Sequence, residues 1–89
     1  MSNQLSSNDT FAFGTGYEGY KVSDEADKTA DSTIRYYGFL NRKGEWFILR
    51  QTVTGTTTDY RFVKGDAAYT TAWSARESQT YNYFDVIFT

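Results

Sequence analysis

Two runs of aromatic and β-branched residues flank an Asn-Arg-Lys-Gly sequence and predict a β-hairpin over residues 33–52. Asparagine at the first turn position and glycine at the fourth favour a type I turn that ends in a left-handed glycine. If Asn41 lies opposite Glu45, the register places Leu40 opposite Trp46. This hairpin predicts a mainly β fold.

The two faces of this hairpin are both apolar. One face carries Ile34, Tyr36, Leu40, Trp46 and Ile48, and the other carries Tyr37, Phe39, Phe47 and Leu49. A half-buried antiparallel strand normally alternates apolar and polar side chains, so we expect both faces to be covered. Phe, Tyr and Trp outnumber Leu, Ile and Val by seventeen to ten, so the core must be built mainly from rings.

Two further strands are predicted after the hairpin. The first covers residues 57–64, where Tyr60 and Phe62 share one face, and a Thr-Gly-Thr turn precedes it. The second covers residues 80–89, where a strand is favoured and a helix with the same rings stays open as an alternative.

A short helix is predicted between these strands, within residues 66–78. Its residues Tyr69, Ala72 and Trp73 recur at helical spacing, and Asp66 is the expected N-cap. The expected fold is therefore a small antiparallel sheet, sandwich or barrel of four to five strands, with one short helix and an extended N-terminal arm.

The N-terminal region differs in composition from the rest. We expect a flexible arm over residues 1–10, a glycine-, ring- and acid-rich extended segment over residues 11–32, and the β domain over residues 33–89. The first two segments together hold six acidic residues and two lysines. Within them, residues 23–32 predict a solvated turn of helix or a loop, and we expect the 11–32 segment to become ordered only against a partner chain.

The absence of histidine and cysteine limits the chemistry of the chain, because it removes disulfides, thiolate nucleophiles and the commonest metal ligands. We therefore expect no enzyme activity, catalytic residue, bound metal or cofactor. Nine Lys and Arg residues and a pI near 4.9 argue against a nucleic-acid partner. No apolar run approaches the roughly 18 residues of a membrane span, and the start lacks signal-peptide features, so we expect synthesis in the cytoplasm and no membrane partner.

Carboxylates offer two chemical interpretations, and each has a structural alternative. The acidic residues of 23–32 lack the ligand spacing, turn glycine and closing glutamate of a calcium loop, so a solvated turn is favoured. Two of Glu45, Asp59, Glu77 and Asp85 would form a hydrolase pair if they met in a cleft about 5–9 Å apart. A chain this short leaves little room for a cleft, so charges that protect strand edges are the favoured interpretation.

The rings suggest two kinds of interaction site. The residues expected to contact another subunit are Tyr37, Phe39, Phe47, Leu49, Val86 and Phe88. The residues that would stack on a sugar, in the alternative interpretation, are Tyr36, Trp46, Tyr60 and Trp73. The same rings are needed for the core, so the sugar-binding interpretation is the second choice.

A resemblance to a known class of protein covers residues 33–83. It is carried by YYGF at 36–39, WFILR at 46–50, YRFVKG at 60–65, and then Trp73, Arg76 and Thr80-Tyr81. This order resembles small β modules of structural proteins in tailed-bacteriophage virions. The resemblance implies a non-enzymatic capsid-decoration, neck or tail component that is located in the virion, is present in multiple copies, and contacts other virion proteins and itself. The alternative is a carbohydrate- or receptor-binding module of a tail fibre.

Overall fold

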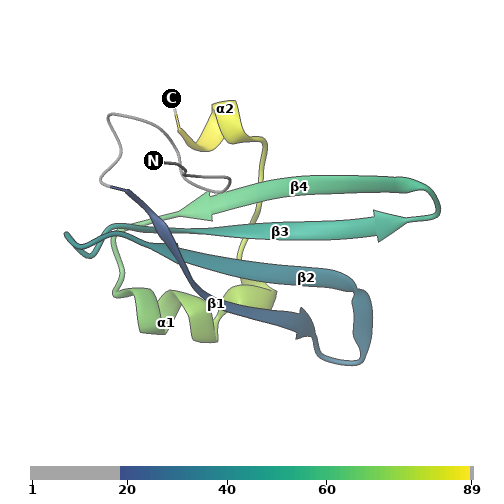
Figure 1. Ribbon diagram of the computed structural model, residues 1–89, viewed down its shortest axis with the longest axis horizontal. Helices are drawn as coiled ribbons and strands as arrows, with labels where there is room; N and C mark the ends of the chain where they lie inside the picture. The colour runs from purple at the N-terminus through teal and green to yellow at the C-terminus, as the bar shows by residue number, and fades with distance from the viewer. Residues whose placement is uncertain (1–18, 89) are drawn as a thin grey trace, which may run out of the picture.

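A four-stranded antiparallel sheet forms the centre of the computed structural model, which describes residues 19–88 (Figure 1). The strands β1 (Lys21–Lys28), β2 (Asp31–Leu40), β3 (Trp46–Thr54) and β4 (Thr57–Lys64) lie side by side in that order. They are followed by helix α1 (Tyr69–Ser74), the 3-10 helix η1 (Arg76–Ser78) and helix α2 (Phe84–Ile87). The mainly β fold is confirmed. The arm predicted for residues 1–10 and the first part of the 11–32 segment lie outside the described residues.

The predicted register of the β2–β3 hairpin is confirmed. Its pairs are Leu40 with Trp46, Phe39 with Phe47, Gly38 with Ile48, Tyr37 with Leu49 and Tyr36 with Arg50. At the turn, the side-chain oxygen of Asn41 accepts hydrogen bonds of 3.0 Å from the backbone N–H groups of Lys43 and Glu45. Gly44 has a φ of 87°, which glycine adopts without a steric penalty. Asn41 and Gly44 therefore define this turn.

Strand β1 corrects the prediction for residues 23–32, which expected a turn of helix or a loop. It pairs with β2 in an antiparallel ladder that places Asp27 opposite Arg35. Arg35 also makes ion pairs with Glu25, at 3.1 Å, and with Asp27, at 3.7 Å. Pairing with β2 and the ion pairs with Arg35 stabilise this charged edge strand, so it needs few apolar side chains. Its sequence therefore lacks the alternation of apolar and polar residues from which a strand is predicted.

The helix predicted within residues 66–78 is present as α1 and η1, but its predicted cap is wrong. Ala68 occupies the N-cap position, so helix α1 begins at Tyr69, two residues after the start that an Asp66 cap would give. No side chain donates or accepts a capping hydrogen bond there. The indole of Trp46 instead donates a 2.7 Å hydrogen bond to the backbone carbonyl of Ala67, which fixes the chain just before the helix.

The strand predicted for residues 80–89 is wrong, and the helical alternative holds for α2. Asn82 forms an isolated bridge with Phe62 of β4, and the chain then turns into the helix. Helical spacing places Phe84 and Phe88 on one side of α2, with ring centroids 4.5 Å apart. Both rings also contact the ring of Phe62. Packing of these three rings explains why a helix replaces the strand.

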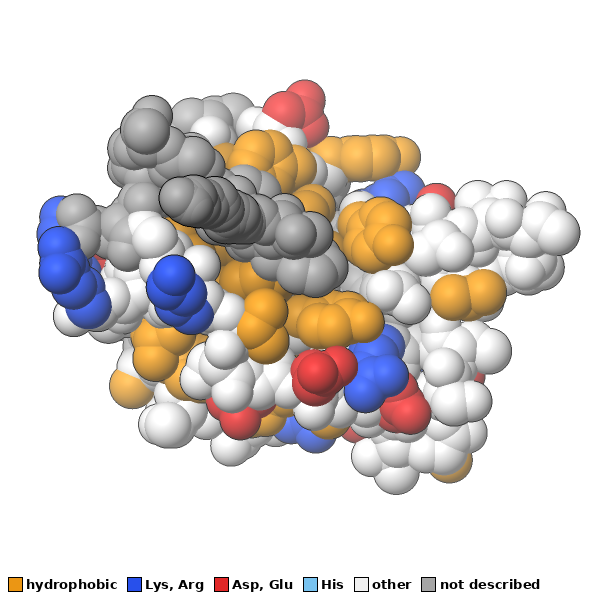
Figure 2. Space-filling view, in the orientation of Figure 1, with side chains coloured by type: hydrophobic (Ala, Val, Ile, Leu, Met, Phe, Trp, Pro, Cys, Tyr) orange, Lys and Arg blue, Asp and Glu red, His pale blue; other side chains and the backbone are white. Residues whose placement is uncertain are grey.

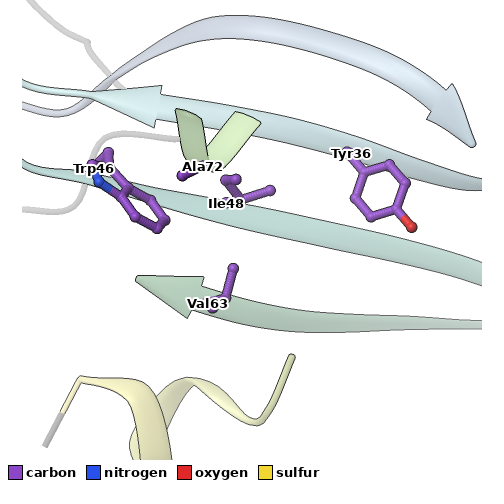
Figure 3. Close-up of a cluster of buried hydrophobic side chains, with 5 residues drawn as sticks. All are labelled: Tyr36, Trp46, Ile48, Val63 and Ala72. Atoms are coloured by element: carbon purple, nitrogen blue, oxygen red, sulfur yellow. The ribbon is translucent and has the colours of Figure 1, made fainter. Parts of the chain in front are cut away.

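Two ring-rich clusters cover the two faces of the sheet, as the two-sided apolar pattern of the hairpin predicts. The first cluster holds Tyr36, Trp46, Ile48, Val63 and Ala72, with Ala72 supplied by α1 (Figure 3). The second cluster holds Tyr20, Phe39, Phe47 and Leu49, with Phe88 packed against it. We call these sides the α1 face and the α2 face. The described chain covers both faces with its own side chains.

Candidate interaction surface

The segment between η1 and α2 crosses the outer edge of β4 and passes from the α1 face to the α2 face. Tyr81 packs against the cluster on the α1 face. Asn82 lies at the edge, where its backbone donates to and accepts from the backbone of Phe62 at 2.9 and 2.7 Å. Phe84 then packs on the ring of Phe62 from the α2 face, at a centroid distance of 5.1 Å. The chain therefore holds this edge from both sides.

Helix α2 packs one side on the sheet and leaves another side exposed. The ring of Phe88 meets the buried ring of Phe47 edge to face, at 5.3 Å. By contrast, Val86 is 52% exposed, and Phe84 keeps 36% of its surface in solvent despite its ring contacts. Tyr83, just before the helix, is 56% exposed. We call Tyr83, Phe84 and Val86 the C-terminal surface.

Figure 2 shows hydrophobic side chains exposed on the side of the molecule where α2 lies, whereas the far end of the β3–β4 hairpin presents mostly neutral polar groups. Tyr60, which is 47% exposed, shares the α2 face of β4 with Phe62. Phe84 packs on the same face through Phe62, whereas Tyr83 stacks on Arg61 of the α1 face, with the guanidinium carbon 4.0 Å from the ring centroid.

The six residues predicted to contact another subunit fall into three environments. Phe39, Phe47 and Leu49 lie in the core of the α2 face, with exposures of 0%, 1% and 5%. Tyr37 and Phe88 are half-buried against that core. Val86 is exposed. The chain's own rings cover the hairpin face that we expected to contact another subunit, and only Val86 belongs to the C-terminal surface.

The four rings predicted to stack on a sugar do not share an exposed surface. Tyr36 and Trp46 are buried in the core of the α1 face, and Trp73 is partly buried against it. Tyr60 is exposed, but it belongs to the α2 face. The structure therefore assigns three of these rings to packing on one side of the sheet and the fourth to the other side.

A pocket of about 400 Å³ lies beside the buried indole of Trp46. It is lined by Tyr20, Glu45, Trp46, Lys64, Gly65 and Asp66. The indole N–H is already engaged by the Ala67 carbonyl, so it offers no donor to a ligand. Lys64 extends over the ring of Phe88, with its amine 5.0 Å from the ring centroid. The charged groups at this pocket are one ammonium and two carboxylates.

Two of the carboxylates considered for hydrolysis have structural partners. Glu45 accepts a 2.8 Å hydrogen bond from the side-chain amide of Asn41. Glu77, on η1, accepts hydrogen bonds of 3.0 Å from the backbone N–H and the hydroxyl of Thr29 in the β1–β2 turn. These hydrogen bonds lower the pKa of Glu77 below its ordinary value. Glu77 thus connects η1 to the turn between the first two strands.

Sequence reasoning missed Phe84 as a surface residue, because it placed the segment on a strand. The spacing of Phe84 and Phe88 is a helical signal that the alternation of rings in this segment obscured. The exposure of Tyr83 follows from the edge crossing at Asn82, which involves β4 and is not local in sequence.

Within residues 19–88, no three acidic side chains come together as a metal site would require. None of the helices in that part of the chain has the length and apolar character to span a membrane. No family model, curated protein or solved structure matches this chain.

Proposed function

We propose that this chain is a non-enzymatic structural protein of a tailed-bacteriophage virion and assembles in multiple copies through its C-terminal surface. The observation that carries the assembly part is the exposure of Tyr83, Phe84 and Val86 within one short segment. Contiguous exposed apolar side chains commonly mark interaction sites. The virion part of the proposal is supported by the sequence resemblance over residues 33–83.

The anchoring of the C-terminal surface also supports this role. Asn82 is bonded to β4 on one side of Tyr83, and Phe84 and Phe88 pack on the sheet on the other side. The exposed side chains therefore project from a segment whose backbone is already in place. Binding to such a surface costs less ordering entropy than binding to a flexible tail.

The substitution Val86→Asp tests the proposal, because it places a charge on the C-terminal surface without removing a buried ring. We expect the wild-type chain to self-associate at high concentration in analytical ultracentrifugation, or to bind purified phage particles that lack it. Val86→Asp should abolish either behaviour. The matched control is Val53→Asp, which changes an exposed valine at the end of β3 and should leave association unchanged.

A folded wild-type chain that stays monomeric and does not bind such particles would overturn the assembly proposal. Circular dichroism of each variant separates loss of association from loss of folding. The number of copies per particle distinguishes the proposed role from the receptor-binding alternative, because a coating protein is abundant in the particle and a receptor-binding module is sparse.

A further inference from the structure

The two outer edges of the sheet differ in their protection against pairing with another strand. Strand β1 carries Asp24, Glu25 and Asp27, and its ladder with β2 contains two register shifts. Charges and bulges of this kind discourage strand addition at an edge. Strand β4 pairs with β3 along its whole length without a shift, and its first half, residues 57–60, carries Asp59 as its one charge. The first half of the β4 edge therefore lacks the protection that β1 has.

The chain itself covers the other half of the β4 edge. The backbone of Phe62 exchanges two hydrogen bonds with the backbone of Asn82, which occupies the position of a fifth strand there. Backbone groups of successive residues in a strand point alternately to its two sides, so those of Thr58 and Tyr60 also point away from β3. Figure 1 shows that η1, α2 and the segment between them leave the half toward the β3–β4 turn clear.

The backbone of this clear half is available for pairing. Within residues 19–88, no other backbone group bonds to the outward side of Thr58 or Tyr60. The guanidinium of Arg61 donates a 2.9 Å hydrogen bond to the Tyr60 carbonyl, which has a second lone pair for another donor. Both residues are exposed, and threonine and tyrosine are common in strands. An edge of this kind is a template for a strand of another chain.

A second copy of the same edge fits this template. When two identical edges pair antiparallel about a twofold axis, outward-pointing residues must face each other. An axis at Asp59 places two carboxylates directly opposite each other, and an axis at Tyr60 places Thr58 opposite Phe62, whose edge is already occupied. An axis closer to the turn leaves fewer residues to pair. An axis at Thr58 avoids these conflicts, and it places the hydroxyl of Thr57 opposite the carboxylate of Asp59 in the other copy.

We propose that two copies of this chain pair antiparallel through the outer edges of β4, with Thr58 of each copy opposite Thr58 of the other. The backbone N–H of each Thr58 donates to the carbonyl of its counterpart, and the two four-stranded sheets join into one. Tyr83 follows Asn82 at the same edge, so the C-terminal surface adjoins the paired strands. This inference rests on the proposed assembly of copies, and it specifies the partner and the contact.

Disulfide cross-linking tests the register, because the chain contains no cysteine of its own. In a hydrogen-bonded antiparallel pair the Cα atoms lie about 5.5 Å apart, a separation that a disulfide spans. We therefore expect Thr58→Cys to form disulfide-linked dimers under mild oxidation, both in solution and on phage particles that lack the wild-type chain. Thr54→Cys is the matched control, because it changes an exposed threonine of the same hairpin that lies on β3. It should cross-link at least tenfold more slowly.

Thr58→Pro tests the hydrogen bonds. Proline has no N–H, but the N–H of Thr58 points away from β3, so the β3–β4 ladder keeps its own bonds. The dissociation constant measured by analytical ultracentrifugation should rise at least tenfold, since both exchanged bonds are lost. Thr58→Val is the control, because it keeps the N–H and the branched side chain, and it should associate like the wild type.

Two results would overturn the strand pairing and leave the proposed function intact. In the first, the wild type associates but Thr58→Cys cross-links no faster than Thr54→Cys. In the second, Thr58→Pro is folded by circular dichroism and associates as well as Thr58→Val. A wild-type chain that neither self-associates nor binds particles overturns both proposals. If Thr58→Pro does not fold, the cross-linking comparison decides.

Discussion

The hydroxyl of Tyr69 reaches the carboxylate of Asp24 across Gly38, and donates to it a hydrogen bond of 2.7 Å. Asp24 and Gly38 are neighbours in the β1–β2 ladder, so the tyrosine of α1 spans two strands. A Cβ atom at Gly38 would lie 2.9 Å from the ring carbon Cζ of Tyr69 and 3.0 Å from Cε3 of Trp73. The absence of a side chain at Gly38 is therefore what lets α1 lie close to the sheet.

Gly38→Ala should destabilise the fold, because the added methyl group forces the two rings of α1 away from the sheet. Overpacking of this kind costs about 1–3 kcal/mol. The measurement is the free energy of unfolding in urea. Gly65→Ala is the control, since its Cβ would lie 3.4 Å from the nearest atom of Trp46, and we expect a smaller change there. Equal effects of the two substitutions would contradict this account of the helix–sheet contact.

Gly44→Val should weaken the β2–β3 turn, because a β-branched residue is strained at the φ of 87° that Gly44 adopts. The expected loss is about 1–3 kcal/mol in the free energy of unfolding. Gly44→Asn should lose less, since asparagine tolerates the left-handed region. A thermal midpoint that does not change in Gly44→Val would show that the turn has another geometry in solution.

The parts of the fold that could be predicted are those that local sequence determines. The β2–β3 register depends on a turn of four residues, and β4 follows from alternation after a second tight turn. Strand β1 could not be predicted, because its stability comes from pairing with β2 and from Arg35, and its own side chains are mostly exposed. Stabilisation that comes from the neighbouring strand leaves little periodic signal in the sequence of the edge strand itself.

The candidate surface was harder to predict than the fold. Rings on both faces of the hairpin indicated that both must be covered, but not whether this chain or another one covers them. Phe88 and Tyr20 cover Phe47 from segments that are distant in sequence. No register between β3 and β4 was predicted from the sequence, so the pairing of Arg50 with Arg61 is known only from the structure. The stacking of Tyr81 on Arg50 and of Tyr83 on Arg61 depends on the bridge at Asn82, which is also not local in sequence.

Phe47→Ala should unfold the chain rather than dissociate an assembly, because the ring is 1% exposed and stacks on Phe39 at 4.5 Å. Truncating a buried phenylalanine costs about 3–5 kcal/mol. Sedimentation and circular dichroism should therefore report a loss of structure in Phe47→Ala, and a folded monomer in Val86→Asp. A folded, monomeric Phe47→Ala would place this ring at a subunit contact instead.

Glu77→Gln should destabilise the fold at neutral pH and have little effect in acid. The pKa of Glu77 is lowered in the folded chain by its hydrogen bonds from Thr29, so its contribution is present above the ordinary value of 4.5. That contribution is lost as the pH falls through the lower, folded-state pKa. The urea midpoints of wild type and variant should therefore converge toward pH 3. Asp66→Asn is a control at an exposed loop position, and a constant gap between wild type and Glu77→Gln would contradict the linkage.

Tyr81 provides the corresponding test at alkaline pH. Its hydroxyl is partly buried and donates to the carbonyl of Arg76, and burial raises its pKa above the ordinary value of 10.0. A raised folded-state pKa means that the stabilising contribution is complete below pH 10 and is lost as the pH rises through the folded-state value. Tyr81→Phe should therefore be less stable than the wild type at pH 8, by about 0.5–1.5 kcal/mol for the lost hydrogen bond. The difference in free energy of unfolding between wild type and Tyr81→Phe, measured in urea, should become smaller above pH 10. A difference that stays constant to pH 11 would show that ionisation of the Tyr81 hydroxyl is not coupled to folding.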